Sequence, residues 1–311
     1  MKKNLLSLAA LALVLGQSAW AQNWPEQLRI TYVPAPFNMQ CMLIKEQGLL
    51  EKALKEHKVQ VKWIPIKAGV NQVQGMAAKE IDMVSAMNSS TLLIANAAGN
   101  PIQAVTGVAR PDDIFALVGH KDRVHGIKDL AGKTVVGPKG TVLHHMFNVV
   151  LQQHALEDKK VELISMNLPS SLTMLMTGRT DAALLVGPLV QKAAAAGHPV
   201  LTTAAGVIPT NLFLSVRKDF AQQYPELVKK VAQVNEQALV WMHEHPKEAL
   251  AIGAKVHNIS QEQAQDLWDR SHFVSGIEQR DIDALTAAQD FLLDQKMMKR
   301  RVNVQEIIWK P

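Results

Sequence analysis

Short apolar runs alternate with amphipathic segments along most of the chain, and this alternation limits the fold more than any other feature. Strand-like runs such as LRITYV (28–33), IQAVTGVA (102–109) and DAALLV (181–186) are separated by segments with helical periodicity. Strands that alternate with helices are typical of parallel sheets covered by helices. The sequence therefore predicts an α/β fold.

The alternation falls into two series. The first ends near the strand IFALVG (114–119), and the second runs from KTVVG (133–137) to VLTTAA (200–205). A further strand, NLFLSV (211–216), is followed by an almost wholly helical region from Phe220 to about Met298. Two series of this length predict two α/β lobes with a cleft between them.

The N-terminus has the three parts of a secretory signal. Lys2 and Lys3 precede an apolar run, and Ala19 and Ala21 stand where a signal peptidase reads. The run is shorter than the roughly 20 apolar residues that span a bilayer. We expect a signal peptide over residues 1–21 and a mature protein that is soluble and exported.

Charge and cysteine usage exclude several kinds of protein. Without residues 1–21 the chain keeps 31 basic and 28 acidic residues, since the signal holds two of the 33 lysines and arginines, so the net charge falls from +5 to +3. This surplus is too small to indicate nucleic-acid binding, and no basic stripe with aromatic residues appears. Cys41, the only cysteine, cannot form an internal disulfide and is expected in the core.

The loops that follow the predicted strands carry the candidate site. Ligands of open α/β sheets lie beyond the carboxyl ends of the strands, where helix N-termini converge. GPKGT (137–141) is no nucleotide loop, because Lys139 precedes the second glycine. It is a glycine turn that presents helix N–H groups to something polar. These loops are PAPFN, MNSST, GPKGT, LPSS and VGP, and none contains Asp or Glu. A ligand with an ammonium group needs a carboxylate, so a neutral or anionic ligand fits better.

Several motifs together resemble a known family. YVPAPFN, MAAKEIDMVSAMNSS, AAGNPIQAV, IKDLAGKTVVGPKGTVLHH and DAALLVGP occur in this order over nearly the whole mature chain. The set resembles the periplasmic solute-binding proteins of ABC importers, above all the NMT1/THI5-like or SsuA-like group that binds sulfonates, nitrate or thiamine-pyrimidine precursors.

The resemblance implies a two-lobed periplasmic-binding-protein fold (type II, Venus-flytrap) with two hinge crossovers. Hinge closure would capture a small ligand, and the closed protein would deliver it to an ABC permease. The crossings are expected near Arg110–Val118 and Gly206–Leu214. Lobe 1 would then hold residues 22–118 and 206–311, and lobe 2 residues 119–205.

Within this framework, the loops supply the candidate ligand contacts. Gly140 and Thr141 match the helix start that the family presents to the ligand. Only one of His144 and His145 can face the cleft, because neighbouring helical positions point about 100° apart. Phe37 is as well explained by core packing, and Arg110 by a salt bridge to Asp112 or Asp113. The expected ligand contacts are Phe37, Asn38, Gln40, Asn88, Ser89, Ser90, Arg110, Gly140, Thr141, His144, Gly187 and Pro188.

Two segments suggest that the lobes share one plan. EIDMVSAMNSS and RTDAALLVGPL each place an aspartate before an apolar strand and end in a loop of small residues. Aligning Asp82 with Asp181 sets Asn88 opposite Gly187. Either the two halves are a duplication, or the likeness is what any strand-to-helix unit shows.

Two other functions remain open. The mature chain holds all 11 histidines, six of them between His120 and His198, but none in a metal-binding spacing such as H-x-x-x-H. An enzyme is the second alternative, because a eukaryotic relative of the family makes a thiamine pyrimidine. That relative carries a CCCFC signature, and this chain has Cys41 alone. We expect no enzyme activity, no cofactor, no metal and a monomer.

Overall fold

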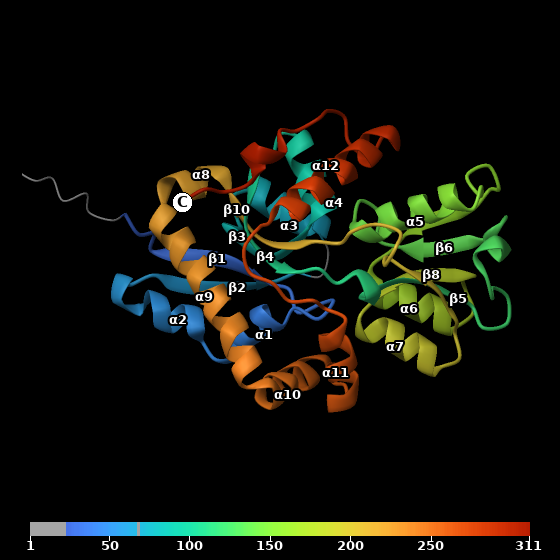
Figure 1. Cartoon of the computed structure of the whole chain (residues 1–311), viewed down its shortest axis with the longest axis horizontal. Coiled ribbons are helices and arrows are strands. Elements are labelled where there is room, and N and C mark those ends of the chain that lie inside the picture. Colours follow the sequence, from blue (N-terminus) through green and yellow to red (C-terminus); the bar gives the residue numbers. More distant parts are fainter. Residues whose placement is uncertain (1–22, 67–68) are drawn as a thin grey trace, which may run out of the picture.

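The computed structural model describes residues 23–66 and 69–311, so the predicted signal peptide lies outside the described residues. Two five-stranded sheets, with strand orders β2-β1-β3-β10-β4 and β7-β6-β8-β5-β9, form two lobes side by side (Figure 1). Helices pack on each sheet. The predicted two-lobed α/β fold is confirmed.

The first sheet joins strands from both ends of the chain. β1 pairs in parallel with β2 and β3, whereas β10 runs antiparallel between β3 and β4. The strands are β1 (Gln27–Tyr32), β2 (Gln60–Pro65), β3 (Met83–Asn88), β4 (Ile102–Ala109) and β10 (Leu212–Arg217). The helices between them are α1 (Met39–Glu46), α2 (Leu49–Leu54), α3 (Gly69–Ala77) and α4 (Ser89–Ala97).

The second sheet repeats this plan with β5 in the place of β10. β6 pairs in parallel with β7 and β8, and β5 runs antiparallel between β8 and β9. The strands are β5 (Phe115–Gly119), β6 (Thr134–Gly137), β7 (Glu162–Ser165), β8 (Ala182–Val186) and β9 (Val200–Thr203). The helices are α5 (Val142–Gln153), α6 (Leu168–Met176) and α7 (Pro188–Ala195).

The chain crosses between the sheets twice, between β4 and β5 and between β9 and β10. β5 belongs to the second sheet, although the expected boundary places residues 115–118 in lobe 1. The reason is its pairing, since Phe115 lies opposite Val186 of β8 and Ala116 opposite Thr203 of β9. The remaining lobe limits stay a prediction.

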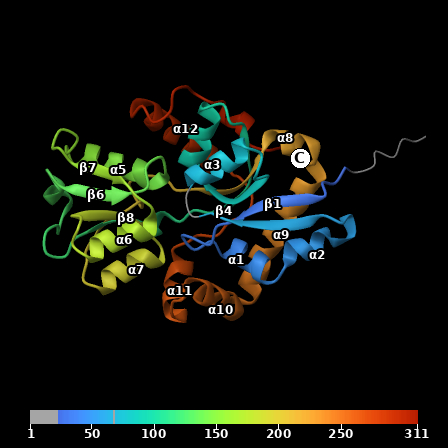
Figure 2. The same ribbon diagram turned by 180° about the vertical axis from the view of Figure 1, so that it is seen from behind.

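The C-terminal helices return to the first lobe, as Figure 2 shows from behind. They are α8 (Lys218–Gln223), α9 (Pro225–Glu244), α10 (Pro246–His257), α11 (Gln261–Asp269) and α12 (Gln279–Asp294). α9 packs against α1, and α12 packs against α4. Within the described residues, no helix combines the length and the apolar character needed to cross a bilayer.

The two aspartates aligned from the sequence have the same role in the two lobes. Asp82 Oδ2 accepts from the N–H of Arg29 in β1 at 2.9 Å, and its own N–H donates to the Arg29 carbonyl. Asp181 Oδ2 accepts from the N–H of Thr134 in β6 at 3.1 Å, and its N–H donates to the Thr134 carbonyl. Each aspartate therefore ties the start of a central strand to its parallel neighbour.

Candidate ligand-binding cleft

A cavity of about 350 Å³ lies between the lobes, beyond the carboxyl ends of the strands. The first lobe lines it with the β1–α1 loop, the start of α3 and the end of β3. The second lobe lines it with the starts of α5, α6 and α7. This is the place in which α/β sheets bind ligands.

Contacts between the lobes flank the cavity. Gly187, which precedes α7, lies so close to the Pro36 carbonyl oxygen of the β1–α1 loop that a Cβ would overlap it. Farther along α7, Gln191 Nε2 donates to Asp266 Oδ2 of α11 at 3.0 Å. The two lobes are therefore in direct contact beside the cavity.

The cavity wall is mainly apolar, with prolines from both lobes among its residues. None of the described residues that line it is an aspartate or a glutamate. The polar side chains of the lining belong to Asn38, Gln72, Asn88, Thr141, Asn167, Lys192 and His257. Such a wall suits a ligand with an apolar body and no ammonium group.

Four of the polar lining residues precede helices, and two of them cap their own helix. Asn88 Oδ1 accepts from the N–H of Thr91 at 2.9 Å, and Asn167 Oδ1 accepts from the N–H of Ser170 at 2.9 Å. These bonds satisfy one N–H in the first turn of α4 and one in the first turn of α6.

The start of α5 is arranged differently. Thr141 is buried, and its Oγ1 donates to the Pro138 carbonyl at 2.9 Å instead of capping the helix. The N–H groups of Val142 and Leu143 therefore have no side-chain acceptor, and both residues line the cavity. Unpaired N–H groups at a helix start attract anions and polar oxygens.

Asn38 precedes α1 and holds the β1–α1 loop. Its amide nitrogen donates to the carbonyls of Val33 at 2.6 Å and Ala35 at 2.8 Å. Its Oδ1 is buried and accepts no hydrogen bond from the described residues. A buried acceptor of this kind is normally satisfied, so this oxygen is an exception among the lining residues.

Four of the twelve expected contact residues line the cavity: Asn38, Asn88, Thr141 and Pro188. Phe37 is 1% exposed and packs in the core, 5.5 Å from the His257 ring between centroids. Gln40 is buried, and its amide donates to the Val108 carbonyl at 2.9 Å. The other six expected residues, which do not line the cavity, are Ser89, Ser90, Arg110, Gly140, His144 and Gly187.

Arg110 is held by an ion pair instead of facing the cleft. Its Nε and Nη2 donate to Asp281 Oδ1 and Oδ2 of α12 at 2.8 and 2.7 Å. The partner is neither Asp112 nor Asp113. Asp112 instead accepts from the N–H and the hydroxyl of Thr210, which ties the two crossovers together. Arg110 therefore ties the end of β4, where the chain leaves the first lobe, to α12.

The two adjacent histidines of α5 both lie outside the lining. His144 Nδ1 accepts from the Gly140 N–H at 3.3 Å. His145 is buried against the first lobe, with its ring stacked 4.3 Å from that of Phe291 in α12 and its Nδ1 3.4 Å from Ser90 Oγ in α4. Burial, and to a lesser degree His144, lowers the pKa of His145 to about 4.

The expectation that ligand contacts lie in the loops after strands missed two basic residues of the lining, Lys192 and His257. Lys192 lies four residues after Pro188, one turn into α7, and His257 ends α10. That expectation covers only residues between the end of a strand and the start of the next helix. The i to i+4 spacing from Pro188 was the available signal for Lys192, because such residues share a helix face. His257 comes from a distant helix and had no local signal.

No metal centre was found in the part of the chain that the structure describes. Across residues 23–66 and 69–311, no three histidine, cysteine, aspartate or glutamate side chains converge as ligands. Cys41 is buried, as expected, and its Sγ lies 3.2 Å from Ser85 Oγ.

Known binding proteins resemble this chain over between about half and nearly all of its length. The "Putative aliphatic sulfonates-binding protein" of Bacillus subtilis (strain 168) is 24% identical, over 99% of this chain and 95% of that protein. The taurine-binding periplasmic protein of Escherichia coli (strain K12) is 27% identical, over 58% of this chain and 56% of that protein.

Solved structures share the fold. The alkanesulfonate-binding protein SsuA from Xanthomonas axonopodis pv. citri, bound to MOPS, superposes with a TM-score of 0.83 at 21% identity, over 92% of this chain and 98% of that chain. The periplasmic-binding-protein fold expected from the sequence is therefore confirmed.

A family model described as NMT1/THI5 like matches residues 54–249, which is more than half of the chain. The chain therefore belongs to the NMT1/THI5-like family.

Proposed function

We propose that this protein is the periplasmic substrate-binding component of an ABC importer. It captures a small neutral or anionic organic solute between its lobes and delivers it to a permease in the inner membrane. The observation that carries the proposal is the cavity between the lobes, with an apolar wall, free N–H groups at the start of α5 and no carboxylate among the described lining residues. Relatives named for binding aliphatic sulfonates and taurine support it.

Ligand capture follows from the two-lobed architecture. A solute in the cavity touches both lobes only while they are together, so binding shifts the population toward the closed form. The permease would recognise this form. The residues proposed to contact the ligand are Asn38, Asn88, Thr141 and Pro188, with the N–H groups of Val142 and Leu143.

Residues 1–21 are proposed to direct export and to be removed, and the mature protein is proposed to work as a monomer. The lobes are proposed to be those expected from the sequence, with residues 115–118 moved to lobe 2 together with β5. Binding without chemical conversion is proposed, because the relatives named above are binding proteins.

A thermal-shift screen of the exported protein tests the proposal. A ligand at 100 times its Kd adds about 2.7 kcal/mol to the free energy of unfolding, which raises the Tm measurably. The panel contains alkanesulfonates, alkanesulfonamides, taurine, nitrate, aminopyrimidines, flavin precursors, Zn²⁺ and Cu²⁺. We expect an organic neutral compound or anion to raise the Tm. A shift with metal ions alone, or the appearance of a product, would replace the proposal with one of its alternatives.

A further inference from the structure

Lys192 and His257 are the basic side chains among the described lining residues, and they come from different lobes. Lys192 extends from α7 of the second lobe, whereas His257 ends α10, which packs on the first lobe. No described acidic residue lines the same cavity. Two bases of the described part of the chain thus share a cavity in which no described carboxylate balances their charge.

Lys192 has no acidic partner among the ion pairs of the described residues. Other lysines at the surface do pair, as Lys255 of α10 does with Glu46 at 3.4 Å. The ammonium group of Lys192 is therefore available at the cavity rim. Its charge also acts on His257, where it helps to lower the pKa.

The ring of His257 has one engaged and one open nitrogen. Nε2 lies 3.2 Å from the Pro34 carbonyl oxygen, which can only accept, so Nε2 carries a hydrogen. Nδ1 is left as the site of protonation. Burial is the main cause that lowers the pKa of His257, the Pro34 carbonyl opposes it, and Lys192 adds to it. The neutral ring is thus favoured while the cavity holds no anion.

We propose that the acid group of a singly charged organic anion lies between Lys192 and His257, and that this pair makes the closed form selective for anions over neutral analogues. This inference rests on the proposed function and names the ligand charge that the cavity recognises. An anion in this place supplies the missing counter-charge and touches one basic group from each lobe, so it holds the lobes together. A neutral ligand gains only the contacts with the cavity wall.

The proposal has a consequence for pH. A bound anion favours protonated His257, so its pKa is higher in the complex than in the free protein. Binding then takes up protons, and the affinity for an anion rises as the pH falls through the pKa of the complex. It levels off below the pKa of the free protein. The charged group that acts on the ring is Lys192 from α7. On the helix of His257 itself, Lys255 is paired with Glu46.

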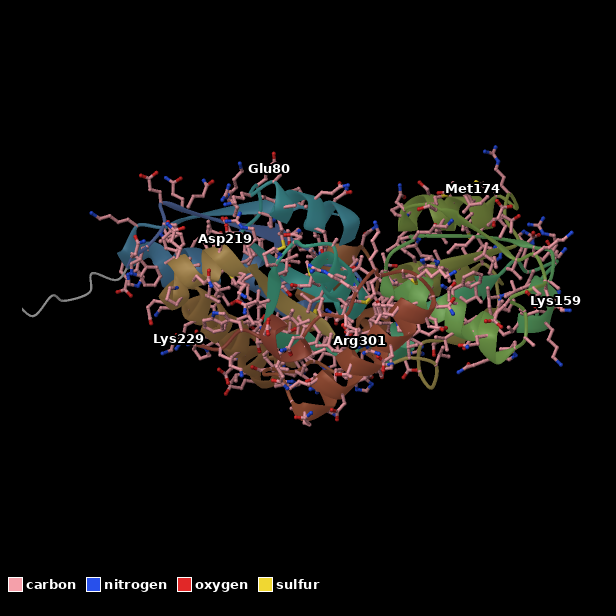
Figure 3. The ribbon with its side chains drawn as sticks, turned by 90° about the horizontal axis from the view of Figure 1, so that it is seen from above. Glu80, Lys159, Met174, Asp219, Lys229 and Arg301 are labelled. Carbon is pink, nitrogen blue, oxygen red and sulfur yellow. The ribbon has the colours of Figure 1, made fainter. Side chains whose placement is uncertain are left out.

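The test compares two probes of nearly equal shape, 1-hexanesulfonate and 1-hexanesulfonamide, by calorimetry on the purified protein. Lys192→Gln is expected to weaken binding of the sulfonate about tenfold, the size of one charge-assisted hydrogen bond, and that of the sulfonamide less than about twofold. Lys192→Arg keeps the charge and is expected to keep most of the affinity. Lys229→Gln, on α9 and far from the second lobe (Figure 3), removes a charge elsewhere and is expected to change neither.

A second measurement tests the protonation of His257 separately from the charge of Lys192. Between pH 7.5 and pH 5.5, the wild type is expected to bind the sulfonate more tightly as the pH falls, with no such trend for the sulfonamide. His257→Gln keeps a donor for the Pro34 carbonyl but cannot titrate, so the trend disappears. A flat profile in the wild type would overturn the proposal.

The outcomes distinguish the proposed anion site from the proposed binding function. If the wild type binds the sulfonate and Lys192→Gln binds it equally well, the anion pair is refuted and the binding function stands. If the sulfonamide binds as tightly as the sulfonate, selectivity for anions is refuted in the same way. If the wild type binds no organic compound of the larger panel, the proposed function itself is refuted.

Discussion

Thr141 illustrates how one hydroxyl determines what a helix start is free to bind. Asn88 and Asn167 turn their side chains onto their own helices, whereas the Thr141 hydroxyl turns back to the Pro138 carbonyl. The N–H groups at the start of α5 remain for a ligand. A sulfonate has three oxygens, so it can accept from these N–H groups through one oxygen and contact a basic side chain through another.

Val142→Pro tests this donor site without disturbing the helix. Proline is favoured at the first helical position, and Thr141 has the extended backbone that a residue before proline needs, with φ −123° and ψ 174°. The variant removes one N–H from the cavity wall. We expect it to bind 1-hexanesulfonate about tenfold more weakly than Val142→Ala, which shortens the side chain but keeps the N–H. Equal affinities of the two variants by calorimetry would place the ligand away from α5.

At the scale of elements, α5 joins the lobes through His145. Its ring is stacked on Phe291 of α12 and faces Ser90 of α4, so a helix of the second lobe rests on two helices of the first. Burial is the largest cause of its lowered pKa, and the ring is neutral near pH 7. Protonating this histidine in place would put an uncompensated charge into the contact.

The pH dependence of stability follows with a definite sign. His145 has a usual pKa of 6.5 and one of about 4 in the folded protein, so between these values the unfolded chain binds a proton that the folded one does not. The neutral His145 ring contributes up to about 3 kcal/mol to the free energy of unfolding. This contribution is complete above pH 6.5 and is lost as the pH falls toward 4. In urea denaturation over this range, His145→Gln should lose less stability than the wild type. His154→Gln, at the exposed end of the same helix, should behave as the wild type.

The strands and helices are easier to predict from the sequence than the elements with which they pair. The run 102–109 was read as a strand from its sequence and is β4. The lobe of β5 was misplaced, because its pairing with β8 and β9 is not written in its own residues. The segment LPSS (168–171), expected as a loop, forms the first turn of α6, because the Asn167 side chain caps this helix.

The same limit applies to the candidate site. Residues of all five expected loop segments line the cavity, since parallel strands bring their carboxyl ends together whatever the side chains are. Arg110 was given a ligand role because its partner, Asp281, is 171 residues away in the sequence. Lys192 and His257 meet at the cavity only through the placement of α7 and α10. Long-range pairing of this kind leaves no local pattern.

For the whole molecule, the β8–α7 loop of the second lobe passes very close to the β1–α1 loop of the first. Gly187 makes this approach possible, since any Cβ there would overlap the Pro36 carbonyl oxygen. Its backbone φ is +50°, a value that residues other than glycine rarely adopt. A substitution at Gly187 therefore has two effects, strain within its own loop and obstruction between the lobes.

Gly132→Ala separates these effects. Gly132 lies in the second lobe with a φ of +70°, and nothing within 4 Å would meet its Cβ. Gly132→Ala should lose about 1 kcal/mol of unfolding free energy to backbone strain. Gly187→Ala should lose more, because its φ of +50° and ψ of −127° lie outside the left-handed helical region. Only Gly187→Ala should also hinder closure.

In small-angle scattering with 1-hexanesulfonate, we expect the wild type and Gly132→Ala to become more compact and Gly187→Ala to stay extended. Calorimetry should show at least about tenfold weaker binding for Gly187→Ala, because an open form that touches the ligand with one lobe loses part of the contacts. Compaction of Gly187→Ala equal to that of the wild type would mean that the ligand-bound form does not bring these two loops together.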